Sequence, residues 1–432
     1  MQALLSFDKA PPFAAPLRFF LTAPLFALAA GLLLAVAGPS LLASRWVPGL
    51  LGATHLITVG FMMQVMLGAL IQILPVVAGA NLASPLATAR WLHAGLSAGA
   101  VLLACAFLFV VPSLFTAAAA TLGVTVAGFL VATGRALRGV PSTSPTIRGL
   151  KLALVGLAGA VGLGVLLTAA LAGGWALPLL ALTDLHAAWA LGAWAGVLLV
   201  AMAYVVVPMF QLTPGYPART SWRFPWLILG LVLAWSVAVA IGLDPLVRLA
   251  QGLTALAGIA FAALTLRLQA QRRRARTDAT QRFWQIGLAS VILALAMVST
   301  AATWPAVAEE PAWPLVAGAL LLVGGFMSFI VGMLYKIVPF LAWLHLRNCG
   351  DGRMPVPNMN RILGDAAMQR QCLAHLLAVI LLPAAAIRPD WLARPAGAAL
   401  ALASGWLFGN LLLATLRYRR YHGEIMRGQA AT

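Results

Sequence analysis

The segment Gly60–Gly79, GFMMQVMLGALIQILPVVAG, decides the fold of this chain, because a similar segment recurs far later in the sequence. The later segment, Gly325–Trp343, reads GFMSFIVGMLYKIVPFLAW. Both open on Gly-Phe-Met, continue through a long apolar stretch and reach a proline. One chain therefore contains the same helix at least twice.

A third, shorter copy lies between these two segments. AMAYVVVP ends at Pro208, GALIQILP ends at Pro75 and GMLYKIVP ends at Pro339, so the three prolines are almost evenly spaced along the chain. A nearly constant period indicates an internal repeat. We expect three repeats of four helices each, at about 15–135, 149–267 and 283–418 within a single domain 1–432, with the three prolines closing the second helix of each.

The composition places these helices in a membrane. Of 432 residues, 62% are hydrophobic and only 9% are charged, too few charges to cover the surface of a soluble domain. Apolar runs of about 20 residues match the thickness of a bilayer core. We expect an all-α polytopic bundle in contact with lipid, and twelve spans at roughly 17–37, 52–77, 90–112, 114–134, 149–173, 182–210, 223–242, 246–266, 283–303, 313–343, 370–388 and 396–417.

The charges of the loops predict the topology. Basic residues follow each even-numbered span from the fourth, as in RLQAQRRRARTDATQR after span 8 and RYRRYHGEIMR after span 12. The opposite loops, such as TWPAVAEEPAW, are poor in Lys and Arg. The positive-inside rule then puts both termini in the cytoplasm of a bacterial-type inner membrane. It also explains the net charge of +18 without a nucleic-acid partner. The N-terminal segment lacks a basic stretch followed by an A-x-A site, so we expect no cleavable signal peptide.

Two histidines stand out within the spans. His55 precedes Pro75 by nearly the same number of positions as His186 precedes Pro208, so both occupy similar depths near the outer starts of spans 2 and 6. Imidazole binds haem iron and copper, and the pair is a candidate for axial haem ligands or part of a copper site. Asp184 could hold the second nitrogen of His186. The alternative is that each histidine is structural at the water interface.

A weaker candidate lies on the cytoplasmic side. LHLRNC and CLAHLL bring together His345, Cys349, Cys372 and His375, a ligand set suited to zinc or copper, and His93 begins span 3 on the same side. A disulfide is not expected there. Methionines recur on the repeated helices, and thioethers suit Cu(I), but we interpret these residues as packing; they are Met62, Met63, Met66, Met202, Met209, Met327 and Met333.

These features resemble a known group of proteins. Twelve spans in three four-helix arcs, with histidines at the outer starts of spans 2 and 6, look like subunit I of the haem–copper oxidases and nitric oxide reductases. HLITVGF with GALIQILPVVAG, and the opening PLRFFLTAPLFALAAGL, are similar to the NnrS family of haem- and copper-containing membrane proteins linked to nitric oxide stress. The resemblance implies His55 and His186 as ligands of haem b, copper or both, and a redox partner protein.

The chain departs from this group at defined positions. FPWLILGLVLAWSVAVAIGL, the seventh span, has no histidine, and neither does the outer half of span 10, so the usual binuclear haem–copper centre cannot form. Ala53 and Leu56 replace a histidine and an acidic residue of the NnrS pattern. We therefore expect a protein of respiratory or nitric oxide metabolism without that centre. The alternative is a cofactor-free permease, or an assembly or metal-handling protein, on the same scaffold.

Overall fold

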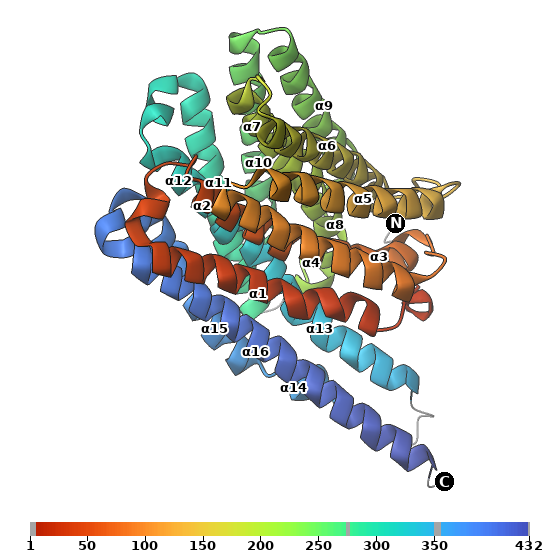
Figure 1. Ribbon diagram of the computed structural model, residues 1–432. Helices are drawn as coiled ribbons and strands as arrows, with labels where there is room; N and C mark the ends of the chain where they lie inside the picture. The colour runs from red at the N-terminus through yellow and green to blue at the C-terminus, as the bar shows by residue number, and fades with distance from the viewer. Residues whose placement is uncertain (1–5, 274–276, 350–355, 431–432) are drawn as a thin grey trace.

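The computed structural model describes residues 6–273, 277–349 and 356–430, and every regular element in these ranges is a helix (Figure 1). Within them, twelve helices are long and apolar enough to cross a membrane. The predicted twelve-span all-α bundle is thus confirmed. Nine spans centre on one helix each: α1 (Ala14–Ala37), α4 (Pro85–Phe109), α5 (Pro112–Leu137), α6 (Pro145–Gly173), α9 (Ala218–Ala240), α10 (Asp244–Ala270), α11 (Ala279–Thr303), α15 (Asp365–Ile387) and α16 (Pro389–Ala430).

The other three spans are the ones that carry the repeated sequence, and each contains a π-helical segment. In such a segment the backbone bonds run to the fifth residue rather than the fourth, which widens the helix, and these segments often mark functional sites. The composite spans are α2 (Pro48–His55), η3 (Leu56–Met63) and α3 (Gln64–Ala78); α7 (Leu179–Ala187), η4 (Ala188–Gly196) and α8 (Val197–Gln211); and α12 (Ala312–Ala319), η6 (Leu320–Met327) and α13 (Ser328–Cys349). Short elements precede the first span or follow and connect others: η1 (Phe7–Lys9), η2 (Gly38–Leu42), η5 (Pro305–Glu309) and α14 (Met359–Ile362).

The three prolines lie inside these helices rather than at their ends. α3 and α8 end within one turn after Pro75 and Pro208, but α13 continues well past Pro339 to Cys349. The expectation that each proline closes its span is therefore wrong for the third copy. A proline removes one backbone donor, and a span packed among other helices tolerates that loss.

Matching positions in the first and third units make the same close contact. A Cβ added at Gly68 would lie 2.7 Å from the Phe19 side chain, and one added at Gly332 would lie 2.8 Å from the Phe283 side chain. Each phenylalanine precedes its glycine by the same number of positions. The π segments also match, since all three end at the same distance before their prolines. The threefold repeat remains a prediction, and these matches favour it.

The first and last spans pack directly against each other, as α1 and α16 do in Figure 1. A Cβ at Gly31 would lie 2.5 Å from the backbone nitrogen of Ala401, and a Cβ at Gly397 would lie 2.3 Å from that of Ala35. Small residues at these points let two backbones approach closely, which is how helices associate where no water drives them together. The contact brings the first and the last membrane span of the chain side by side.

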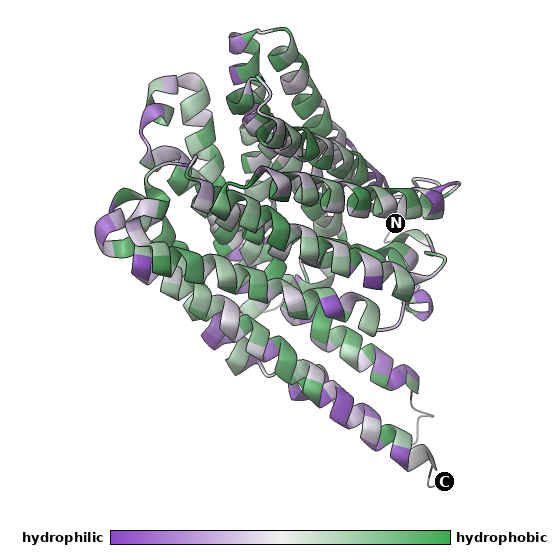
Figure 2. Ribbon diagram, viewed as in Figure 1, coloured by the Kyte–Doolittle hydropathy of each residue, from purple (hydrophilic) through white to green (hydrophobic). Residues whose placement is uncertain are grey.

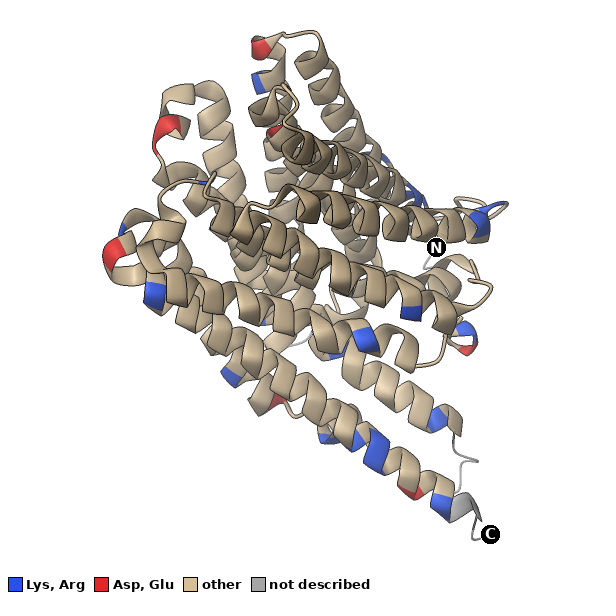
Figure 3. Ribbon diagram, viewed as in Figure 1, with Lys and Arg blue, Asp and Glu red and all other residues tan. Residues whose placement is uncertain are grey.

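Hydropathy and charge vary along the helices of the bundle, from their ends to their middles. Apolar residues cover the shafts of the helices and polar residues gather at their ends (Figure 2). Lysines and arginines gather toward the end of the bundle where both chain termini lie (Figure 3). Twelve crossings bring both termini to the same side of a membrane, in agreement with this picture.

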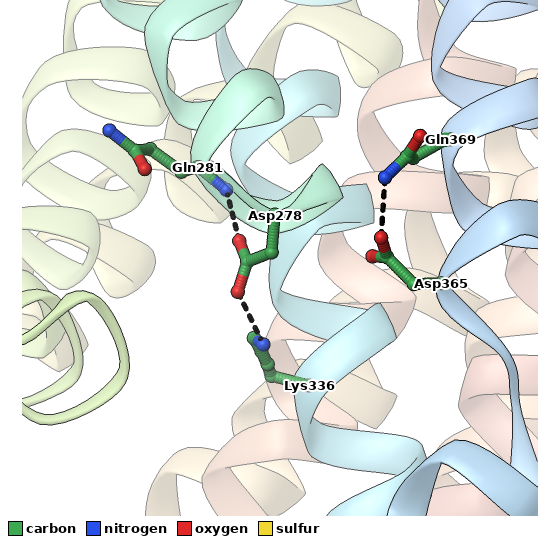
Figure 4. A network of polar contacts seen from close by, with 5 residues as sticks. All are labelled: Asp278, Gln281, Lys336, Asp365 and Gln369. Atoms are coloured by element: carbon green, nitrogen blue, oxygen red, sulfur yellow. Dashed lines mark hydrogen bonds and ion pairs between the residues drawn. The ribbon is translucent and has the colours of Figure 1, made fainter. Parts of the chain in front are cut away.

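One ion pair lies at the start of α11. Lys336 Nζ is 2.8 Å from Asp278 Oδ2, and the backbone N–H of Gln281 donates to Asp278 Oδ1 at 3.0 Å (Figure 4). Asp278 is thus the N-cap of α11 and also holds α13 through Lys336. Figure 4 also shows Gln369 donating to Asp365 in the first turns of α15.

Candidate metal site between two histidines

His55 and His186 lie together in the interior of the bundle. His55 is the last residue of α2, directly before the first π segment, and His186 lies in α7, two residues before the second. Their ring centroids are 6.4 Å apart and their planes are inclined by 22°. Two imidazoles from distant parts of the sequence therefore share one site.

Both rings are held in the same way, through Nδ1. His55 Nδ1 lies 2.8 Å from the carbonyl oxygen of Leu51, one helical turn earlier, and His186 Nδ1 lies 3.0 Å from that of Ala160 on α6. A carbonyl only accepts hydrogen bonds, so the proton of each neutral ring is on Nδ1. Each Nε2 then carries a lone pair, and within the described part of the chain neither Nε2 has a hydrogen-bond partner. Metal-binding histidines are oriented by this kind of bond.

The two rings open into a cavity of about 320 Å³. Its walls come from spans 2 to 6 and are mostly apolar; Phe107, for example, stacks on His55 with ring centroids 5.3 Å apart. The hydroxyls of Thr58 and Thr168, also on the wall, donate to carbonyls of their own helices. The two imidazoles therefore supply the unused nitrogen donors of this wall, and Met62, Met63 and Met66 add thioether sulfurs to it.

The separation of the rings fits a single metal between them. An imidazole nitrogen lies about 2 Å from a bound first-row metal, so two rings on opposite sides of one metal have centroids about 6 Å apart. The observed 6.4 Å agrees with that arrangement. The apolar walls also suit the flat apolar face of a porphyrin. In donor type and ring separation, His55 and His186 thus suit either haem iron or copper.

Asp184 does not hold His186, contrary to the sequence-based expectation. Its carboxylate forms an ion pair with Arg45, with Nη1 and Oδ1 2.8 Å apart, and each side chain is more than a third exposed. The Arg45 guanidinium also lies 4.3 Å from the ring centroid of Trp46, which lines the cavity. Asp184 and Arg45 therefore link span 6 to the loop after span 1 at the edge of the site.

The proposed set of His345, Cys349, Cys372 and His375 is not assembled. His375 Nε2 lies 2.8 Å from Ser328 Oγ, and His345 lies on the same helix as Ser328 but almost five turns later, about 25 Å farther along. Both nitrogens of His345 contact carbonyls, at Leu341 and Pro11. Among the described residues, no three His, Cys, Asp or Glu side chains are placed to hold a metal.

His93 also has a structural partner. Its Nε2 lies 2.8 Å from Thr22 Oγ1, and Phe19 packs edge-on against its ring with centroids 5.3 Å apart. The residue ties α4 to α1. Its assignment as a metal ligand is therefore not supported by the geometry.

Sequence reasoning missed two features of the site. The carbonyl of Ala160, which orients His186, belongs to another span and has no signal in the sequence. The sequence did show Met62, Met63 and Met66, but as packing residues; the structure places all three on the cavity wall that holds His55 and His186. Their position on the same helix, two to three turns after His55, was the available signal.

Comparison with known proteins adds no assignment: no protein-family model matches the sequence, and no curated protein matches it either. The resemblance drawn from the sequence motifs thus stands on those motifs alone.

Proposed function

We propose that this chain is an integral membrane metalloprotein that holds a redox metal, haem b iron or copper, between His55 and His186. The observation that carries the proposal is the pairing itself: two imidazoles at 6.4 Å, each with Nδ1 bound to a carbonyl and Nε2 available. The resemblance to the NnrS and haem–copper oxidase groups favours a role in respiratory or nitric oxide metabolism.

If the bound group is haem, two histidine ligands favour electron transfer over reduction of a bound gas. When bound, the metal supplies a one-electron couple. If the bound group is haem, His55 and His186 would both hold its iron, which would then lack a free position for oxygen or nitric oxide. The chain's own groups would then orient the ligands and exclude water: the carbonyls of Leu51 and Ala160 fix the tautomers, and the apolar wall keeps the site dry.

We place the protein in a bacterial-type inner membrane, with the basic end in the cytoplasm. His55 lies near the start of a span that begins at Pro48 and runs toward the basic end. The metal would therefore lie in the half of the bilayer that faces away from the cytoplasm. A redox partner on that side, or in the membrane, would supply or accept its electron.

The test is the optical spectrum and metal content of detergent-purified protein from cells supplied with haem precursor and copper. We expect a Soret band or stoichiometric copper in the parent protein, and its loss in His55→Ala and in His186→Ala. His93→Ala is the matched control and retains the metal, because His93 is hydrogen-bonded to Thr22 elsewhere. Parent protein with neither signal would reject the proposal and favour a cofactor-free permease or assembly factor.

A further inference from the structure

A second cavity, of about 170 Å³, lies between the three repeated helices. Its walls come mainly from α3, α8 and α13, and we call it the axial cavity. The lining is mostly apolar, although it includes Gln72 and Trp284, whose Oε1 and Nε1 are buried without a hydrogen-bond partner among the described residues. One lining residue, Phe7, belongs to η1, which precedes the first membrane span. The start of the chain is therefore part of the wall of this cavity.

Residues 6–13 dock across one end of the axial cavity. The backbone N–H of Ser6 donates to the carbonyl of Val76 at 3.1 Å, and Phe7 packs edge-on against Phe340 with ring centroids 5.3 Å apart. Val76 and Phe340 both line the cavity, and each directly follows the repeated proline of its helix. Phe7 therefore covers the cavity at matching points of the first and third repeated helices.

His345 holds the other end of this segment. Its Nε2 lies 3.2 Å from the carbonyl oxygen of Pro11, and its Nδ1 lies 2.8 Å from that of Leu341, one turn earlier in α13. Phe13 stacks on the same ring, with centroids 5.5 Å apart and planes inclined by 30°. A hydrogen bond and a ring contact thus join the segment to α13.

The two hydrogen bonds of His345 require a charged ring. A carbonyl oxygen only accepts hydrogen bonds, a neutral imidazole has one N–H, and an imidazolium has two. Both bonds therefore form together only when His345 is protonated. His55 and His186 differ, since each ring contacts one carbonyl, which a neutral imidazole satisfies. If His345 loses its proton and keeps the bond within its own helix, the bond to Pro11 is lost.

We propose that residues 6–13 form a proton-controlled plug, which closes the axial cavity while His345 is protonated and is released when His345 loses its proton. The docked segment gives both ring N–H groups an acceptor, so protonation and docking favour each other. Docking is therefore strongest at acidic pH and weakens as the pH rises. The face of Phe13 also attracts a positively charged ring.

Other titratable groups lie on the elements that pack around His345. The thiol, phenol and carboxyl groups are those of Cys349, Tyr418, Tyr421, Asp8 and Glu424. In water, carboxyls titrate at about pH 4, thiols at about pH 8.5 and phenols at about pH 10. The permanently charged groups are Lys9, Arg18, Arg347, Arg361, Arg417 and Arg419. Among the described residues of these elements, His345 and His422 are thus the groups expected to change charge between about pH 5.5 and about pH 7.5.

The first test measures docking by electron paramagnetic resonance of a nitroxide at Lys9→Cys, an exposed position of the segment, in a Cys105→Ser/Cys349→Ser/Cys372→Ser background. We expect an immobile label at about pH 5.5 and a mobile fraction about threefold larger at about pH 7.5, the effect of losing one hydrogen bond. His345→Gln should give the larger mobile fraction at both pH values, because glutamine does not titrate. His422→Gln is the matched control and keeps the pH response.

The second test measures entry into the axial cavity at a single pH of about 6. In the same cysteine-free background, a thiol at Met202→Cys lies on the wall of the axial cavity. Its reaction with a methanethiosulfonate reagent should become about threefold faster when Phe7→Ala or His345→Gln is added, because the plug then no longer closes the cavity. A thiol at Met63→Cys, on the wall of the histidine cavity only, is the control and keeps its rate.

A label equally mobile at both pH values, a pH response that survives His345→Gln, or a Met202→Cys rate unaffected by Phe7→Ala would each overturn the inference. If His345→Gln does not fold, the pH response of the parent and the effect of Phe7→Ala still decide. None of these measurements uses a bound metal. Absence of a metal at His55 and His186 would therefore reject the proposed function and leave the plug in place.

Discussion

At the scale of single residues, the sequence predicted the depth of His55 and His186 but not their partners. Counting back from the repeated prolines placed both imidazoles at one level, and they lie 6.4 Å apart. Asp184 was assigned to His186 from its proximity in sequence. In a helix, residues two apart point about 200° away from each other, so Asp184 faces Arg45 at the edge while His186 faces Ala160.

Gly31 offers a residue-scale test of the packing between the first and last spans. Gly31→Ala places a Cβ against the backbone of Ala401, which cannot move aside as a side chain would. We expect the free energy of unfolding to fall by about 1–3 kcal/mol, as for other overpacked cores. Thermal unfolding in detergent measures the change.

Gly409→Ala is the control for this substitution, because nothing lies within 4 Å of an added Cβ there. It should leave stability unchanged or raise it by up to about 1 kcal/mol through helix propensity. Equal destabilisation by both substitutions would contradict the close contact of α1 and α16.

At the scale of elements, hydropathy predicted twelve spans but not their internal breaks. Runs of apolar residues define length, and the observed spans extend beyond the expected ones by several residues, most at α16. The π segments in spans 2, 6 and 10 have no such signal, because one extra residue does not change the hydropathy of a mostly apolar run. The sequence repeat alone marked these three spans as special.

The first π segment sets the direction of His55 relative to α3. Deleting Ile57 removes one residue between them, and the helix before the deletion then turns by about 100° relative to the helix after it. We expect metal at the histidine pair to be lost while the protein still elutes as a folded monodisperse species. The matched deletion of Leu321, in the third π segment, leaves that metal in place because no histidine adjoins it. Retention of metal after both deletions would count against the role of η3.

The ion pair of Asp278 and Lys336 stabilises the junction of α11 and α13. Lys336→Met should lower the free energy of unfolding by about 1–2 kcal/mol, less than for a fully buried pair because both side chains retain some exposure. Asp278→Ala should cost about 1 kcal/mol more, since it also removes the N-cap. Combining Lys336→Met with Asp278→Asn should recover part of the loss, because asparagine caps equally well. Thermal unfolding of these variants measures the changes. Equal losses of unfolding free energy in Lys336→Met and Asp278→Ala would refute the double role of Asp278.

At the scale of the whole molecule, loop charge predicted an arrangement with both termini at the basic end, and Figure 3 shows the basic residues gathered there. The sequence did not predict that α1 and α16 would pack together, because contacts between the ends of a chain leave no local pattern. Nor did it predict that three helices far apart in the chain would line one cavity, beside a second cavity lined by spans 2 to 6.

Reporter fusions test the orientation. A fluorescent protein fused after Thr432 should be bright, because it folds in the cytoplasm, and alkaline phosphatase inserted between Glu309 and Glu310 should be active, because it folds outside. Alkaline phosphatase inserted after Gly215, in the loop between α8 and α9, serves as the inactive control. The reverse pattern would contradict this orientation. It would show that the protein is inserted the other way round, with the histidine cavity on the cytoplasmic side.

The most direct test of the central claim is pulsed electron paramagnetic resonance of oxidised protein labelled with ¹⁵N-histidine. The claim predicts two directly coordinated ¹⁵N nuclei at one paramagnetic centre, Fe(III) or Cu(II), and one of the two signals lost in His55→Ala or in His186→Ala. A centre with one or no histidine nitrogen, or one unaffected by both substitutions, would contradict it.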